Sequence, residues 1–212
     1  MTSGRFIAFE GGEGAGKSTQ ARLLCEALRN RGLEVVLTRE PGGTKGAEAI
    51  RELLLDPEGA SWEPAAEALL FAAARSDHVA QLVRPALERG AWVICDRFID
   101  STRAYQGGGG GLDDEDILEL HRVGSGGLMP DLTVLLEATP EEIAKRLARR
   151  DGGESDRIGG REAEFHARVE QAFRHFAEAE PARFVRIDGS GPPEATHMAI
   201  LEALAPLFAD ES

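Results

Sequence analysis

The chain has 212 residues, of which 42% are hydrophobic and 29% charged, and its 24 basic and 37 acidic side chains give a formal charge of −13. Such an acidic chain is not expected to coat DNA or RNA, because that function needs a basic face that replaces the phosphate counterions. Membrane insertion is not expected either, since the longest apolar run has seven residues and a spanning helix needs about 18 or more.

Short apolar segments alternate along the chain with longer segments in which apolar residues recur at helical spacing. The short segments predict strands at residues 5–10, 35–37, 91–95, 132–136 and 184–187. The longer segments predict helices at residues 18–31, 47–55, 64–89, 101–105, 113–123, 162–178 and 194–208, and one more that begins at Pro140. Pro85 is expected to kink or restart the long third helix, because proline removes a backbone donor.

The predicted strands are apolar on both faces, which is typical of a parallel sheet covered by helices on both sides. Ligands of such sheets bind at the carboxyl ends of the strands. Gly11, Arg39 and Asp96 each follow a predicted strand, so we expect one cleft to contain all three. Glycine clusters between the elements, including residues 107–111, predict loops.

Residues 11–18 read GGEGAGKS and fit the phosphate-loop pattern G-x-x-x-x-G-K-[ST], between a predicted strand and a predicted helix. The glycines let backbone amides point at phosphate oxygens, and the helix N-terminus adds the positive end of its dipole. Lys17 is expected to reach the β- and γ-phosphates, and the Ser18 hydroxyl is expected to bind Mg²⁺. The ATP-binding residues expected in this segment are Gly11, Gly12, Glu13, Gly14, Ala15, Gly16, Lys17, Ser18 and Thr19. The motif predicts a three-layer α/β fold of the P-loop NTPase type.

The strand at 91–95 delivers Asp96 and Arg97 at its carboxyl end. An aspartate after an apolar strand is most often a turn former or a helix cap. Beside a phosphate loop, however, the same pattern favours an aspartate that orients hydrated Mg²⁺. The planar fork of donors on Arg97 suits a second anionic group, and the alternative for Arg97 is a surface salt bridge.

Seven segments, in this order, closely resemble the thymidylate kinase family from about residue 5 to residue 190. They are GGEGAGKST at 11–19, TREPGGT at 38–44, LLFAAAR at 69–75, DRFIDST at 96–102, AYQG at 104–107, PDLTVLLE at 130–137 and DRI at 156–158. The resemblance implies transfer of phosphate from ATP to dTMP, giving dTDP, on a five-stranded parallel sheet with a small lid at about residues 149–161. It also implies a homodimer.

The resemblance implies roles for individual side chains. Glu13 takes the 3′-hydroxyl of the deoxyribose, and Arg39 and Arg97 bind the dTMP phosphate. Phe71 stacks on thymine, Arg75 donates to its O4, and Thr102 faces its N3 together with Gln106. Tyr105 fills the space that a ribose 2′-hydroxyl needs, and Arg146 borders the adenine of ATP. Gly159 departs from the acidic residue that often follows DRI, which leaves the details of the lid open.

The family supplies an arginine to the transferring phosphoryl group either from the phosphate loop or from the lid, and this phosphate loop contains none. Residues 145–161 carry six basic and three acidic side chains, a local charge of +3. We expect Arg157 to be the catalytic cation, with Arg149 and Arg150 next in effect. The alternative is a solvated, flexible loop.

Three other functions deserve comparison. A regulatory GTPase needs an Asn-Lys-x-Asp motif, which is excluded because the single asparagine, Asn30, precedes Arg31. A non-catalytic ATP-binding module does not explain the base-facing residues, and a kinase for another nucleoside monophosphate is the closest alternative. Cys25 and Cys95 are the only cysteines and the N-terminus lacks a secretory signal, so we expect a reduced, cytoplasmic protein.

Overall fold

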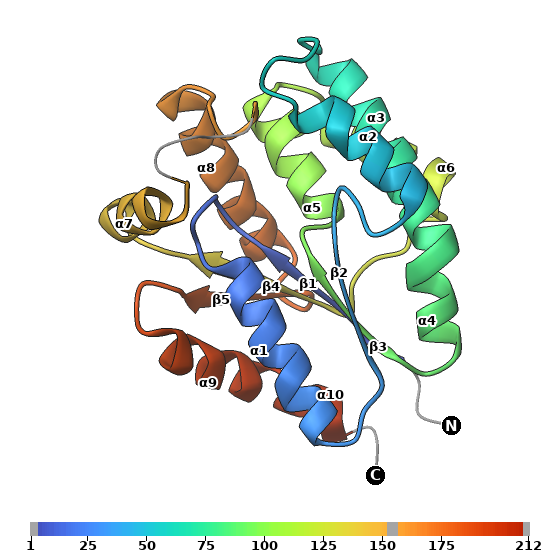
Figure 1. Ribbon diagram of the computed structural model, residues 1–212, viewed down its shortest axis with the longest axis vertical. Coiled ribbons are helices and arrows are strands. Elements are labelled where there is room, and N and C mark those ends of the chain that lie inside the picture. Colours follow the sequence, from blue (N-terminus) through green and yellow to red (C-terminus); the bar gives the residue numbers. More distant parts are fainter. Residues whose placement is uncertain (1–3, 152–156, 210–212) are drawn as a thin grey trace.

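The computed structural model describes residues 4–151 and 157–209, apart from the side chains of residues 149–151 and 209. Its centre is a parallel sheet of five strands in the order β2-β3-β1-β4-β5 (Figure 1). The strands are β1 Phe6–Glu10, β2 Val35–Arg39, β3 Trp92–Asp96, β4 Leu132–Glu137 and β5 Phe184–Asp188. The predicted fold class and all five predicted strands are confirmed.

Helices cover both faces of this sheet (Figure 1). They are α1 Lys17–Asn30, α2 Lys45–Leu55, α3 Pro64–His78, α4 Arg84–Glu88, α5 Ile99–Thr102, α6 Asp114–Ser125, α7 Pro140–Asp151, α8 Ala163–Ala179, α9 Pro193–Ala203 and α10 Ala205–Ala209. Two π-helical segments are η1 Val79–Val83 and η2 Arg103–Gly109. As expected, the long helix from Pro64 is interrupted before Pro85, which lies in the first turn of α4.

The alternation of side chains along β1 divides the core into two layers. Ile7 and Phe9 pack in the cluster that includes α1 and α9. Phe6 and Ala8 point to the other face and pack in the cluster that includes η1, α4 and α6. Because both faces are covered, every residue of β1 is buried, including the charged Glu10.

One glycine cluster differs from its prediction. Gly107, Gly108 and Gly109 belong to η2 rather than to a loop. Packing against α8 explains this: a Cβ on Gly108 would lie 2.5 Å from the Cβ of Ala172, and one on Gly109 would lie 2.5 Å from the Phe165 ring. Here glycine allows two helical segments to approach closely. The terminal helix predicted at 194–208 is also divided, into α9 and α10.

Along the described ranges, 4–151 and 157–209, no helix combines the length and the apolar character needed to cross a bilayer.

Candidate active site

The phosphate loop joins β1 to α1 at the carboxyl edge of the sheet. Three of its glycines have a positive φ, Gly11, Gly14 and Gly16, and two of them show most clearly why glycine is needed. A Cβ on Gly11 would lie 2.3 Å from the carbonyl oxygen of Leu136 on β4, and Gly16, which caps α1, has a φ of +102°. The loop therefore lies close against the sheet and turns sharply into the helix, as its sequence predicts.

Lys17 is buried at the start of α1, and its amine lies inside the loop. The Nζ donates to the carbonyl oxygens of Gly11, at 3.0 Å, and Gly12, at 2.6 Å. Burial, followed by the nearby guanidinium of Arg97, lowers the pKa of Lys17 to about 7, although Asp96 opposes the shift. An anion in the loop would reverse this effect, because it compensates the charge of the ammonium group.

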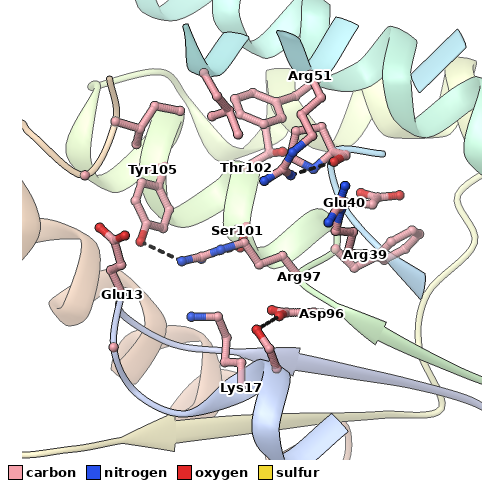
Figure 2. A pocket seen from close by; sticks show the side chains of 18 of the residues that line it. Glu13, Lys17, Arg39, Glu40, Arg51, Asp96, Arg97, Ser101, Thr102 and Tyr105 are labelled. Carbon is pink, nitrogen blue, oxygen red and sulfur yellow. Dashed lines mark hydrogen bonds between the residues drawn. The ribbon is translucent and has the colours of Figure 1, made fainter. Parts of the chain in front are cut away.

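Ser18 and Asp96 meet across the ends of α1 and β3. The Ser18 hydroxyl donates to a carboxylate oxygen of Asp96 at 2.5 Å, and Figure 2 shows this contact below Arg97. A hydroxyl and a carboxylate side by side fit Mg²⁺, which takes oxygen ligands, typically one or two from the protein with the rest from water and phosphates. Among the described residues, no cluster of three or more His, Cys, Asp and Glu side chains could hold a metal ion without such help.

Arg97 lies at the centre of the cavity, between Lys17 and Tyr105 (Figure 2). Its guanidinium donates to the Ser101 hydroxyl at 3.0 Å and to the Tyr105 hydroxyl at 3.3 Å. Within the described part of the chain, it is the one non-glycine residue with a positive φ, 69°. This strained backbone directs the side chain toward the cavity at the point where β3 ends.

Glu10 explains how the strained turn at Arg97 is held. Its buried carboxylate accepts from the backbone amides of Phe98, at 2.8 Å, and Ser101, at 3.1 Å, and from the Ser101 hydroxyl at 2.6 Å. Burial and the neighbouring Asp100 raise the pKa of Glu10 to about 7, although Arg97 opposes the shift. Glu10 therefore fastens the turn after β3 to the strand before the phosphate loop.

A second, buried group of polar side chains surrounds Arg75. Its Nε donates to Glu40 at 2.7 Å, and one Nη donates to the Thr102 hydroxyl at 2.8 Å. Glu40 in turn contacts Nδ1 of His78 at 2.9 Å, and Nε2 of His78 contacts the Thr38 hydroxyl at 2.7 Å. This chain of contacts fixes Arg75, which is 2% exposed.

The structure brings most of the predicted site residues to one cavity of about 630 Å³. The predicted residues that line it are Glu13, Gly14, Gly16, Lys17, Ser18, Thr19, Arg39, Phe71, Arg75, Asp96, Arg97, Thr102, Tyr105, Gln106 and Arg146. Counted over the whole lining, seven basic and three acidic side chains face this space. The cavity is thus a local cationic region in an acidic chain, which suits anionic ligands.

Arg39 lines this cavity from β2 and Arg146 lines it from α7. Arg39 is exposed and donates to Glu48 at 3.1 Å. Arg146 donates to the carbonyl oxygens of Ala15, at 3.1 Å, and Gly189, at 2.6 Å, and so ties α7 to the phosphate loop and to the loop after β5.

The structure describes only part of the segment predicted to form a lid. Residues 152–156 and the side chains of Arg149 and Arg150 lie outside the described residues, so their predicted roles stay predictions. Arg157 is described, and it does not line the cavity. Its guanidinium donates to the carbonyl oxygens of Leu54 and Ala60, at 3.0 and 2.7 Å, and to Glu67 at 3.1 Å. In this conformation Arg157 is engaged with α2 and α3 rather than with the phosphate loop.

Sequence reasoning missed several residues of the site, chiefly Glu10, Glu40, Arg51 and Ser101. Arg51 lines the cavity from α2 and donates to the carbonyl oxygen of Pro41 at 2.8 Å. The available signal was the position of the acids: Glu10 ends an apolar strand directly before the phosphate loop, and Glu40 stands between Arg39 and Pro41 in TREPGGT. A charged residue at a buried strand end has to find a partner, but the sequence does not say which.

Comparison with known proteins adds independent findings. A family model described as thymidylate kinase matches residues 9–200. The chain is 55% identical over 205 residues to the thymidylate kinase of Rhizorhabdus wittichii, covering 97% of this chain and 99% of that protein. It is 51% identical over 215 residues to the thymidylate kinase of Chromohalobacter salexigens, covering all of both proteins.

A solved structure gives the same result. The crystal structure of thymidylate kinase from Ehrlichia chaffeensis superposes with a TM-score of 0.78 at 33% sequence identity, covering 95% of this chain and 99% of that one.

Proposed function

Since the chain belongs to the thymidylate kinase family, we propose that it phosphorylates dTMP to dTDP with ATP and Mg²⁺ in the cavity that joins the phosphate loop to Arg75. One observation supports this proposal above the others. Lys17, Arg75, Arg97, Thr102 and Gln106 line the same cavity; Arg97 lies between Lys17 and Thr102 (Figure 2), and Thr102 is bonded to Arg75. A protein that only binds ATP would not need the group of side chains around Arg75 and Thr102.

Mg²⁺ fits the paired oxygens of Ser18 and Asp96, and when bound it would neutralise charge on the β- and γ-phosphates. Lys17 holds the same phosphates from inside the loop. The phosphate of dTMP is already an anionic nucleophile, so no residue has to form a covalent intermediate. Catalysis then consists mainly of placing the two phosphates in line and stabilising the charge between them.

Arg97 is the described cation best placed for that charge. It reaches from the end of β3 toward the space between the two ends of the cavity, and Ser101 and Tyr105 hold its guanidinium. Arg39 binds the outer side of the dTMP phosphate, and Glu13 binds the 3′-hydroxyl. We expect the additional lid cation to be Arg157, with Arg149 and Arg150 next in effect; in the described conformation the guanidinium of Arg157 is bonded to Leu54, Ala60 and Glu67, so it would have to leave these partners to reach the phosphates.

A coupled assay of ADP release tests the function. The panel of acceptors is dTMP, dUMP, dCMP, dGMP, AMP and UMP at equal concentration. A clear preference for dTMP supports the proposal, whereas equal or greater activity with AMP, UMP, dCMP or dGMP would assign the chain to another nucleoside monophosphate kinase.

Replacing Arg75 by alanine should reduce the preference for dTMP over dCMP by about 10- to 100-fold. The reason is that the remaining Nη1 of Arg75 bonds to no described residue, and we assign it to O4 of thymine. The amino group of cytosine cannot accept that hydrogen bond. The measurement is kcat/KM for both nucleotides, and an unchanged ratio in a folded variant would show that Arg75 does not read the base.

The homodimer is supported by three large apolar side chains that are exposed on helices packed side by side. Leu53 on α2 is 54% exposed, Leu69 on α3 is 56% exposed and Val123 on α6 is 70% exposed. If this face forms the dimer interface, replacing Leu69 by glutamate should convert the dimer to a monomer, because the substitution would bury a charge among apolar side chains. Light scattering measures the mass; an unchanged dimer would place the interface elsewhere.

We also propose the remaining assignments made from the sequence: residues 1–212 as one nucleoside monophosphate kinase domain, ATP and dTMP rather than nucleic acid or membrane as its partners, and the cytoplasm as its location. Two free, buried cysteines are consistent with a reducing compartment.

A further inference from the structure

Glu67 is a buried carboxylate for which the proposed reaction has no use. It lies on α3, one turn before Phe71 and two turns before Arg75, and its exposure is 0%. One carboxylate oxygen accepts from Arg157 at 3.1 Å and from Arg161 at 2.5 Å. The other oxygen accepts from the Nε2 amide of Gln106 at 3.1 Å.

A carboxylate at this position is costly for a helix that is otherwise rich in alanine. Removing a charged group from water is unfavourable unless hydrogen bonds and opposite charges compensate it, and even a compensated pair is often no better than apolar packing. Arg157 and Arg161 supply the opposite charges here. A contribution to stability therefore does not explain why a carboxylate occupies position 67. A role in fixing the geometry of its third partner, Gln106, explains it.

That third partner is Gln106, which lines the cavity where the base binds. An ionised carboxylate accepts hydrogen bonds and cannot donate them. Gln106 must therefore turn its NH₂ group toward Glu67. Its Oε1 is then the amide atom that Glu67 does not contact. Among residues 4–151 and 157–209, no donor is bonded to that Oε1, so it is available to a ligand.

We propose that Glu67 is a positioning residue for base selection: by accepting from Nε2 of Gln106, it presents Oε1 of Gln106 as an acceptor to N3–H of the pyrimidine. This inference rests on the proposed function. Arg157 and Arg161 hold the carboxylate from the opposite side, so residues 157–161 take part in the selection without touching the base.

The resulting pattern separates the pyrimidines by chemistry. Arg75 offers a donor to O4, and Gln106 offers an acceptor to N3–H, so thymine and uracil match both. Cytosine presents an amino donor and an unprotonated N3, so it mismatches both. If the Gln106 amide were free to turn over, its NH₂ group would suit N3 of cytosine, and half of the discrimination would be lost.

The test is Glu67→Gln, which keeps the size of the side chain but can donate as well as accept. The Gln106 amide is then no longer forced into one orientation. We expect the ratio of kcat/KM for dTMP to that for dCMP to fall about tenfold. The KM for dTMP should rise, and the KM for ATP should stay within twofold of the wild-type value.

The matched control is Glu137→Gln. Glu137 is partly buried and also pairs with two arginines, Arg174 and Arg186, each at 2.8 Å, but it does not line the cavity. It should lower the melting temperature as Glu67→Gln does, yet leave the dTMP to dCMP ratio unchanged. A fall of the ratio in both variants would mean that the loss of any such ion pair has this effect, and it would overturn the proposal.

Gln106→Met supplies a second, independent variant that leaves Glu67 with its two arginines. It should lower the same ratio, and adding Glu67→Gln to it should cause no further loss, because the two residues act through one amide. An unchanged ratio in Gln106→Met, or in a folded Glu67→Gln, overturns the inference. If the wild-type protein itself fails to phosphorylate dTMP, the proposed function fails instead.

Discussion

Replacing Lys17 by alanine is expected to lower kcat by about 10³-fold or more while the protein stays folded. The Nζ lies inside the phosphate loop and contacts the carbonyl oxygens of Gly11 and Gly12. Arg146 also contacts this loop, but its guanidinium is bonded to the carbonyl oxygen of Ala15 at 3.1 Å, so without Lys17 the charge on the β- and γ-phosphates would lose its nearest partner. The measurement is kcat at saturating ATP and dTMP, with circular dichroism to verify the fold.

Lys45→Ala is the control, because Lys45 is exposed at the start of α2 and does not line the main cavity. It should keep the wild-type kcat. The Lys17 variant should also keep its melting temperature, since burial already lowers the pKa of the amine to about 7 and makes its charge costly to the free protein. Near-normal turnover by folded Lys17→Ala would contradict the phosphate-loop assignment.

The sheet and the phosphate loop were predictable because their signals are local. An apolar segment that runs into GGEGAGKS specifies strand, loop and helix within about twenty residues, and the structure has β1 and α1 there. The same holds for Asp96, which follows an apolar strand that ends beside the loop. The alternation of apolar residues in strands and their spacing in helices involve residues close together in the chain, so both can be recognised in a single sequence.

The contacts of Glu67 and Glu10 were not predictable in this way. Gln106 and Arg161 lie 39 and 94 positions from Glu67 in the chain, and only the packing of α3 against η2 and the segment at 157–161 brings them together. Glu10 likewise acts on Ser101, which is 91 positions away. For Arg157, the basic segment at residues 145–161 suggested a catalytic role, which stays a prediction; its contacts with α2 and α3 could not be predicted from the sequence.

Replacing Arg97 by alanine is expected to lower kcat by about 10³-fold and to raise the KM for dTMP as well. Arg97 lies between the phosphate loop and the base-binding end, and its conformation is strained: a φ of 69° costs a non-glycine residue about 1–3 kcal/mol. Glu10 holds the adjacent turn through the amides of Phe98 and Ser101. Because the fold maintains this strain at Arg97, we infer that the position of its guanidinium contributes to the reaction.

Two further variants separate position from charge. Arg97→Lys keeps the charge but loses the planar fork that Ser101 and Tyr105 hold, so it should recover only part of the lost kcat. Arg89→Ala removes an exposed arginine that pairs with Glu34 on the surface, and it should behave as wild type. The decisive comparison is between the changes in kcat and in KM of Arg97→Ala. Loss of an interaction that is made equally with bound dTMP and with the transition state changes KM alone. A higher KM with an intact kcat would make Arg97 a binding residue only, and the transition-state charge would then have to be met by Lys17, Mg²⁺ and the lid.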